Sequence, residues 1–366
     1  MKIVLTSNSS WNLYNFRFHL IKTLLKQKHE VIIISSYDNY SNDLIKLGCK
    51  FKKIKVDQRG ISVFRDFILF IKYFFLIKQI KPDYLLSFTI KPNIYGSLAS
   101  NFLNVKTINT ITGLGSVFLK KNLVTIIVEL LYFISLKKSY KIFFHNKEDL
   151  KFFLKRKIIS KQSNSVIKGS GIDLKEYKFS QMKFKKNVIN FLFIGRIIRE
   201  KGFFDLIKAI KIIKKKYNNI NFEILGNTST NFSNDVTLSK LNIWQKEKLI
   251  IYHGYQRDVR KYINNCHCLI LPSYREGLSR AIIECIVKGR PIISNNVPGC
   301  KDLIQHNKNG FLCKKNDFID LSNMIEKFIN LNNNQKKAMG IYGYKKYALD
   351  LDIDKVNAKY IDLIYK

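Results

Sequence analysis

Two short apolar segments near the start of the chain decide its fold: residues 2–6 read KIVLT and residues 31–35 read VIIIS. Runs of this length that are rich in β-branched residues predict strands that are buried on both faces. Residues 16–27 between them carry apolar side chains at helical spacing. Together the three segments predict a βαβ unit, in which the two strands are parallel and the helix crosses over.

The same alternation of strand and helix continues along the chain. In the first half we expect further strands at 84–88, 106–110 and 141–145. After a polar and basic stretch at 180–186, which we interpret as a linker, the alternation restarts, with strands expected at 190–195, 221–225, 250–253, 268–272 and 291–294. The sequence therefore predicts an α/β protein with two doubly wound parallel sheets. The expected domains span 1–180 and 187–350, and a last helix within 351–366 is expected to pack back toward the first domain. Two such domains would form a cleft, and ligands of these sheets bind at the carboxyl ends of the strands.

The composition is strongly basic, with 64 Lys and Arg residues against 27 Asp and Glu residues and a net charge of +37. Such an excess favours an anionic partner: nucleic acid, an acidic membrane or a phosphorylated substrate. Only 11 of the basic residues are arginines, the side chains best suited to bind phosphate oxygens in pairs. The excess of basic residues is spread over both halves of the chain. Because no nucleic-acid-binding motif is present either, we expect no nucleic-acid partner.

The six cysteines predict no metal site. None forms a C-x-x-C pair, and Cys266 and Cys268 are too close in sequence for ordinary zinc spacing. We interpret all six as buried free thiols in a reducing cytoplasm, and we expect no metal and no cofactor. The segment that begins at Met1 reads as a strand and lacks the apolar core of a signal peptide, which agrees with a cytoplasmic protein.

Two apolar stretches, residues 61–80 and residues 123–136, need to be tested as membrane spans. The first places Lys72 near its centre, and the second is only 14 residues long, whereas a spanning helix needs about 20 apolar residues. Both stretches fit core helices. Both also fit helices that lie in the headgroup plane, with lysines toward anionic lipid.

The strongest chemical signal is residues 272–284, which read PSYREGLSRAIIE. A strand is expected to end at Pro272 and a helix to begin near Leu278. Glu276 and Glu284 would be separated by about 12 Å if the helical rise held between them. The helix N-terminus between them offers backbone N–H groups and a positive dipole end for a phosphate. A ligand with a diphosphate centre and a hydroxylated ring at each end, such as a nucleotide sugar, matches this layout.

The second signal is residues 195–202, which read GRIIREKG and follow the first strand of the second half. Arg196 and Lys201 can converge on a diphosphate there. Gly195 would let the ligand come close, and Gly202 would permit the turn into the next helix.

These two elements, in this order, resemble glycosyltransferase family 4 of the GT-B fold, in particular its members of bacterial polysaccharide and lipid-linked-oligosaccharide synthesis. Further elements of that family are similar to residues 90–96, 112–115, 169–173, 289–293 and 297–300. The resemblance implies a retaining, metal-independent enzyme with Glu276, Arg196 and Lys201 as its catalytic residues. It also implies a donor site made by Gly195, Gly277, Leu278, Ser279 and Glu284.

The first half supplies candidates for acceptor binding. These are Asn15, Arg17, Lys91, Thr112 and Gly113. Many members of the resembling family carry a histidine on the loop at residues 109–115, but this sequence has none there. His145, at an expected strand end, is the one histidine that we keep as a site candidate.

We therefore expect a transferase that moves a hexose or N-acetylhexosamine from a nucleotide-diphosphate sugar, with UDP as the carrier, to a lipid-linked saccharide in cell-surface glycan synthesis. The expected partners are the donor, the lipid-linked acceptor and the anionic inner face of the cytoplasmic membrane. The alternatives are an enzyme of the same fold with a soluble acceptor and, from a different class, a basic nucleic-acid-binding protein. A scaffold with a dead site is disfavoured because Glu276, Glu284, Arg196 and Lys201 are all present.

Overall fold

The chain consists of two compact units. A computed structural model describes residues 1–57, 60, 62–118, 122–160, 164–184, 188–228 and 236–365. The first unit comprises Met1–Gly171 together with Ile353–Lys366, and the second, which we call the inserted unit, comprises Ile172–Asp352. The division after Gly171 precedes the boundary expected at residue 180, and the last helix belongs to the first unit.

The first unit is built on a seven-stranded sheet in which all neighbouring strands are parallel. Its order is β3-β2-β1-β4-β5-β6-β7, so the direction of strand addition reverses between β1 and β4. The strands are β1 Lys2–Ser7, β2 Glu30–Ser35, β3 Lys50–Lys53, β4 Tyr84–Phe88, β5 Lys106–Ile111, β6 Lys141–Phe144 and β7 Asn164–Val166. The two edge strands, β3 and β7, were not predicted, because they are short and polar.

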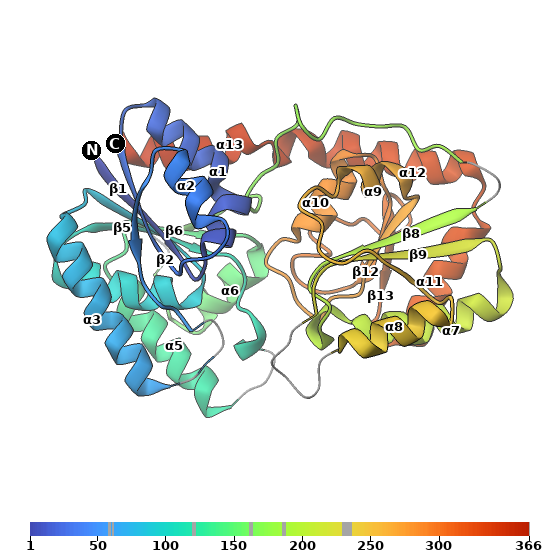
Figure 1. Cartoon of the computed structure of the whole chain (residues 1–366), viewed down its shortest axis with the longest axis horizontal. Helices are drawn as coiled ribbons and strands as arrows, with labels where there is room; N and C mark the ends of the chain where they lie inside the picture. The colour runs from blue at the N-terminus through green and yellow to red at the C-terminus, as the bar shows by residue number, and fades with distance from the viewer. Residues whose placement is uncertain are drawn as a thin grey trace. The chain divides into compact units, whose positions relative to one another are not determined.

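Helices cover both faces of this sheet (Figure 1). One face packs against α1 Ser10–Lys26, α2 Ser41–Lys46 and α13 Ile353–Ile364. The other packs against α3 Val63–Ile80, α4 Ser97–Phe102, α5 Leu123–Leu136 and α6 Lys147–Lys155, with a π-helical turn at Pro92–Gly96 and a 3-10 turn at Ser116–Phe118. Among the described residues no helix has both the length and the apolar character needed to cross a membrane.

The inserted unit has a six-stranded parallel sheet of order β10-β9-β8-β11-β12-β13. Its strands are β8 Ile189–Ile194, β9 Ile220–Leu225, β10 Ile251–Tyr252, β11 Cys268–Leu271, β12 Ile292–Asn295 and β13 Gly310–Cys313. Its helices are α7 Phe203–Lys216, α8 Leu238–Lys246, α9 Arg260–Asn265, α10 Arg280–Val287, α11 Phe318–Asn330 and α12 Asn333–Tyr347, with 3-10 turns at Arg199–Lys201 and Ala348–Leu351. The predicted doubly wound α/β architecture is confirmed for both units.

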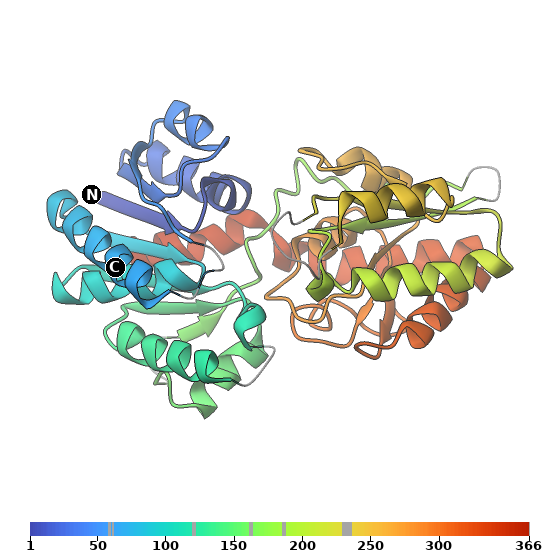
Figure 2. The same ribbon diagram turned by 60° about the horizontal axis from the view of Figure 1, so that its bottom comes forward.

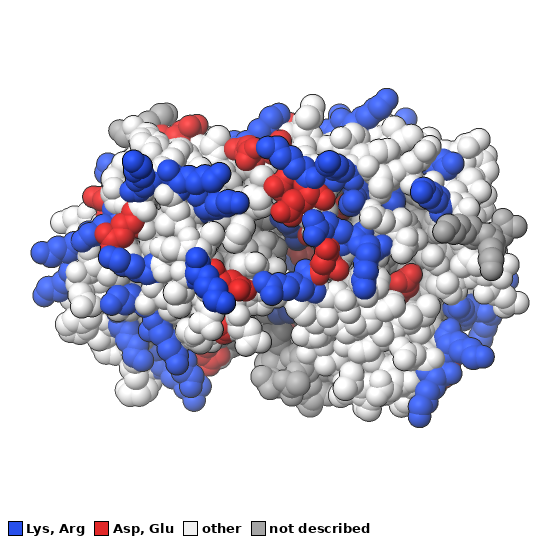
Figure 3. Space-filling view, turned by 45° about the horizontal axis from the view of Figure 1, so that its top comes forward, with Lys and Arg blue, Asp and Glu red and all other residues white. Residues whose placement is uncertain are grey.

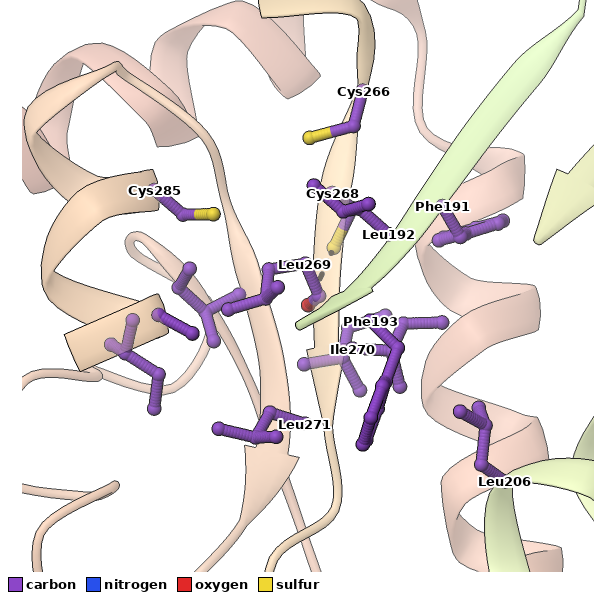
Figure 4. Packing of buried hydrophobic residues seen from close by; sticks show 14 of the residues in the cluster. Phe191, Leu192, Phe193, Leu206, Cys266, Cys268, Leu269, Ile270, Leu271 and Cys285 are labelled. Atoms are coloured by element: carbon purple, nitrogen blue, oxygen red, sulfur yellow. Dashed lines mark hydrogen bonds between the residues drawn. The ribbon is translucent and has the colours of Figure 1, made fainter. Parts of the chain in front are cut away.

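The core of the inserted unit lies where β8 and β11 pair at its centre (Figure 4). Cys266, Cys268 and Cys285 lie among apolar side chains there, and burial raises the pKa of the Cys268 and Cys285 thiols well above the usual range. All six cysteines are buried and free, as the sequence predicts.

Basic side chains are scattered over the surface. On the face drawn in Figure 3, lysines and arginines lie over both units and are interspersed with acidic residues. No single stripe gathers them on that face, in agreement with the even spread of charge along the sequence.

Candidate donor-binding site

The strand order of the inserted unit indicates where a ligand is expected to bind. From β8 the chain moves outward through β9 to β10, and then returns to place β11 on the other side of β8. A crevice forms outside the carboxyl ends of the strands at such a reversal. The two segments singled out in the sequence, residues 195–202 and 272–279, directly follow β8 and β11, so both lie at this reversal.

The two segments are locked together by backbone contacts. Gly202 has a φ of +69°, and a Cβ at this position would lie 1.9 Å from the carbonyl oxygen of Pro272. The Tyr274 N–H donates to the carbonyl of Glu200 at 2.9 Å. Glycine is therefore required at position 202 both for its left-handed conformation and for the close approach of the two loops.

This locking brings two candidate catalytic side chains into contact. The Lys201 ammonium forms a short ion pair with the Glu276 carboxylate. Their side chains are 20% and 11% exposed. An ammonium has three N–H donors, so Lys201 can keep Glu276 as a partner and still donate to a phosphate oxygen. The sequence placed both residues at the site but did not predict that they pair.

A third loop fixes the backbone of Glu276. Its N–H donates to the carbonyl of Pro298 at 3.2 Å, and a Cβ on Gly299 would lie 2.4 Å from the Glu276 carbonyl oxygen. Residues 296–299 follow β12, so three neighbouring strands supply loops to one place. Glu276 is therefore held at both its backbone and its carboxylate.

Helix α10 begins two residues later than expected. Its first residue is Arg280, because Ser279 is extended at φ −68° and ψ 121° and serves as the N-cap. The predicted helix start near Leu278 was wrong, and the separation of about 12 Å worked out for the two glutamates does not apply because Glu276 lies outside the helix. The buried Ser279 side chain makes no capping hydrogen bond, and Gly277 and Leu278 form the approach to the helix N-terminus.

Glu284, one turn into α10, is only 7% exposed. Its Oε1 accepts from Arg280 Nε at 2.9 Å and from the Tyr177 hydroxyl at 3.0 Å. Burial and the nearby Glu284 carboxylate raise the pKa of Tyr177, which keeps that hydroxyl protonated as a donor. Tyr177 is a contributor to the site that the sequence did not reveal, because nothing in its local sequence distinguishes it.

Gly195 and Arg196 lie at the end of β8. A Cβ on Gly195 would meet only side chains, the nearest at 3.7 Å, so packing inside the unit does not require glycine there. Arg196 is exposed. The residue after it extends the pairing of β8 with the chain that follows β9, because the Ile197 N–H donates to the carbonyl of Asn227 at 2.9 Å. Because packing does not explain the glycine at position 195, the absence of a side chain there is consistent with a ligand that approaches the backbone closely.

In the first unit, Arg17 is buried rather than at the surface. It is 2% exposed, its guanidinium carbon lies 4.3 Å from the centre of the Phe88 ring, and its Nη2 lies 3.4 Å from His145 Nε2. Burial, and next the charge of Arg17, hold the pKa of His145 well below its usual range. The structure thus brings together the acceptor candidate Arg17 and the histidine candidate His145, a pairing that the sequence did not predict.

The other acceptor candidates are distributed along the carboxyl edge of the same sheet. The Asn15 side chain donates to the carbonyl of Trp11 at 2.8 Å. Lys91 forms an ion pair with Asp66. Thr112 and Gly113, the latter at φ +128°, follow β5. Asn15 and Lys91 are thus held by neighbours within the first unit.

The Cys266-His267-Cys268 sequence is structural. Both ring nitrogens of His267 are occupied by backbone: Nδ1 accepts from the Asn190 N–H at 2.9 Å, and Nε2 donates to the Lys183 carbonyl at 3.0 Å. Burial lowers the pKa of His267, which favours the neutral ring that this arrangement needs. The residues here serve packing, not metal binding.

Comparison with known proteins gives matches along most of the chain. The family described as Glycosyl transferases group 1 matches residues 175–346, and the family Glycosyl transferase 4-like matches residues 2–146. The chain is 28% identical over 345 residues to N,N'-diacetylbacillosaminyl-diphospho-undecaprenol alpha-1,3-N-acetylgalactosaminyltransferase of Campylobacter jejuni, covering 89% of this chain and 88% of the relative. It is 26% identical over 348 residues to the capsular polysaccharide biosynthesis glycosyltransferase CapM of Staphylococcus aureus, covering 89% and 87%. The crystal structure of Anabaena Alr3699/HepE in complex with UDP and glucose matches with a TM-score of 0.81 at 15% identity, over 100% of both chains.

The fold and these matches define a glycosyltransferase of the GT-B class. Within that class the chain belongs to glycosyltransferase family 4, as the resemblance in its sequence predicts.

Proposed function

We propose that the protein transfers a hexose or N-acetylhexosamine, with retention of anomeric configuration and without a metal ion, from a UDP-sugar to a saccharide on a lipid diphosphate. The product would enter cell-surface glycan synthesis, and the enzyme would work as a peripheral protein at the inner face of the cytoplasmic membrane. The names of the Campylobacter and Staphylococcus relatives support the lipid-linked acceptor and the capsular context. The UDP bound in the Anabaena protein supports the choice of carrier.

The observation that carries the proposal is the ion pair between Lys201 and Glu276 at the reversal between β8 and β11. In the proposed reaction the bond between the sugar and the diphosphate breaks, further negative charge develops on the leaving diphosphate, and Lys201 and Arg196 are the cations that stabilise it. The N-terminus of α10, approached through Gly277, Leu278 and Ser279, adds a positive dipole end.

The two glutamates would bind the hydroxylated rings of the donor, one ring each. Glu276, which holds Lys201, would accept hydrogen bonds from hydroxyls of the transferred sugar. Glu284, oriented by Arg280 and Tyr177, would accept hydrogen bonds from the ribose diol. Gly195 would leave room for the ligand beside them. The acceptor would be bound in the first unit by five residues: Asn15, Arg17, Lys91, Thr112 and Gly113.

Thermal shift with UDP, GDP and ADP in parallel, with EDTA present throughout, tests the donor site. We expect a clear rise in melting temperature with UDP. Transfer is then measured with UDP-sugars and a lipid-diphosphate saccharide, and the anomeric configuration of the product is read by NMR. Loss of transfer in EDTA would overturn metal independence, and an inverted product would overturn retention. Transfer to soluble sugars alone would favour the enzyme with a soluble acceptor. A steep salt dependence of binding to random duplex DNA, with no nucleotide-induced shift, would favour the nucleic-acid-binding alternative.

A further inference from the structure

One outer layer of the first unit exposes an unusual amount of apolar surface. Half of the exposed large apolar side chains of the described residues lie on α3, α4 and α5, although these helices form only a small part of the chain. Five of these side chains are each at least 61% exposed: Phe64 and Phe75 on α3, Phe102 at the end of α4, and Leu123 and Ile126 on α5. We call this surface the apolar face. Contiguous patches of this kind mark interaction sites, whereas singly scattered apolar residues do not.

The side chains are arranged as stripes and not at random. On α5 the exposed residues recur at helical spacing through Leu123, Ile126 and Leu130, while Thr125 and Tyr132 on the opposite side are buried. On α3 the same pattern sets Phe64 and Phe75 opposite the buried Leu69, Tyr73 and Ile77. Each helix therefore has a second apolar stripe, in addition to the one that packs on the sheet.

The stripes belong to one surface. Helices α3, α4 and α5 pack on the same side of the sheet, and α4 contacts both of the others. Phe102 at the end of α4 lies with its ring centre 6.0 Å from that of Phe70 on α3. Figure 1 and Figure 2 both show α3 and α5 on this outer side of the first unit. The apolar side chains of α3 and α4 are thus in contact, and α5 lies next to α4 on the same side of the sheet.

The exposed charged side chains on α3 and just after α5 are all positive. The acids of α3 and α5 are paired within the unit: Asp66 with Lys91, and Glu129 with Arg156 at 3.1 Å. The exposed lysines Lys72 and Lys78 on α3, and Lys137 and Lys138 just after α5, remain beside the apolar stripes. Apolar side chains bordered by lysines suit the boundary between the headgroups and acyl chains of an anionic bilayer.

We propose that the protein lies on an anionic phospholipid bilayer through this apolar face, with the side chains of α3, α4 and α5 in the outer acyl region and the lysines among the headgroups. The inference rests on the proposed function, because an acceptor with a lipid anchor is held in the membrane. No segment of the chain needs to cross the bilayer for this attachment.

Flotation with phospholipid vesicles tests the proposal. The full chain should bind vesicles of phosphatidylcholine mixed with phosphatidylglycerol, and bind vesicles of phosphatidylcholine alone more weakly. The double variant Phe75→Glu/Ile126→Glu should lower the partition coefficient on the mixed vesicles at least about tenfold, because two large apolar side chains no longer leave water. The matched control is Leu238→Glu/Ile243→Glu on α8, whose side chains are 54% and 52% exposed in the inserted unit. This control should bind as the unaltered protein does.

A second variant separates charge from apolar insertion. Lys137→Gln/Lys138→Gln should weaken binding to the mixed vesicles about tenfold or more and leave binding to phosphatidylcholine nearly unchanged, since each lysine acts only on anionic lipid. It also keeps the test decisive if the glutamate variant does not fold. Equal vesicle binding by all variants would overturn the proposal. So would a dimer in sedimentation that the glutamate substitutions dissociate, because a second copy of the chain would then cover the face.

The vesicle measurement does not depend on transfer, so it distinguishes failure of this inference from failure of the proposed function. If the proposed function holds, Phe75→Glu/Ile126→Glu should retain full activity toward a short-chain, water-soluble diphosphate acceptor and lose activity toward the same saccharide in vesicles. Vesicle binding without any transfer would leave the apolar face as a membrane surface and refute the proposed acceptor. Equal activity of the variant on both acceptors would refute the inference.

Discussion

Replacing Lys201 with methionine removes the cation that links the two loops at the reversal between β8 and β11 and keeps a similar side-chain length. In the folded protein its partner Glu276 is 11% exposed and would lose its counter-charge. Losing an exposed ion pair lowers the unfolding free energy by about a few tenths of a kcal/mol, and breaking a buried pair lowers it by about 3–5 kcal/mol. Since this pair is partly buried, we expect the unfolding free energy to fall by about 1–3 kcal/mol. In the inserted unit this corresponds to a fall in melting temperature of about 2–4 °C per kcal/mol.

In the proposed reaction the same substitution also removes a preorganised donor to the leaving diphosphate. We expect a fall in kcat of about 10²–10³-fold, equivalent to about 2.7–4 kcal/mol. Stability and catalysis can be separated by adding Glu276→Gln, which removes the unpaired charge. The double variant should recover most of the melting temperature and none of the turnover.

Lys216→Met is the matched control in the same unit, because Lys216 pairs with Glu326 at 3.0 Å but the two side chains are 54% and 26% exposed. It should cost less than about 1 kcal/mol and leave kcat unchanged. Thermal melts and initial rates with a UDP-sugar give both readouts. Recovery of turnover together with stability in the double variant would refute a catalytic role for Lys201 and leave it as a structural residue.

Three further outcomes are expected. Gly202→Ala should lower the melting temperature by several degrees because of its positive φ and the backbone clash, whereas Gly195→Ala should leave stability unchanged and weaken UDP binding in calorimetry; equal stability of the two would contradict this contrast. Glu284→Ala should weaken binding of UDP much more than that of its 2',3'-dideoxy analogue, and a uniform loss would argue against a contact with the ribose. Burial lowers the pKa of His145 and His267, so the unfolded chain takes up protons first and the unfolding free energy should fall as the pH drops below about 6.5. His267→Asn should flatten that decline in thermal melts recorded across pH, and an unchanged slope would count against the assignment.

The motifs were located from sequence, but their side-chain partners were not. The strands that end just before Gly195 and Pro272 could be recognised from apolar runs, so the loops could be placed at strand ends. The ion pair of Lys201 with Glu276 depends on β8 and β11 being neighbours, and strand order is set by the packing of the whole unit and not by local pattern.

Arg17 shows the same limit in the first unit. An arginine in the second turn of a helix is expected at the surface, but the ring of Tyr360 on α13 lies 5.8 Å from its guanidinium. A helix from the other end of the chain thus helps to bury it, and no local pattern around Arg17 could predict this cover. Strands β3, β7 and β13 were missed for a simpler reason: all three are short strands at sheet edges, and β3 and β7 are also largely polar.

The ends of the inserted unit meet. The Ile172 N–H donates to the carbonyl of Leu351 at 2.8 Å, and Ile172 forms a β-bridge with Asp352. In polymer terms the unit is a long loop whose ends are held together by its own first and last residues. The contacts of these residues therefore offset the conformational entropy that is lost when the loop closes, and the flanking chain does not have to supply that free energy. On the other side of the junction, a Cβ on Gly171 would lie 2.6 Å from the Cα of Ile353, so the flanking chain is also nearly continuous. Such an architecture permits insertion, removal or exchange of the inserted unit as a whole, by breaking and re-forming two peptide bonds.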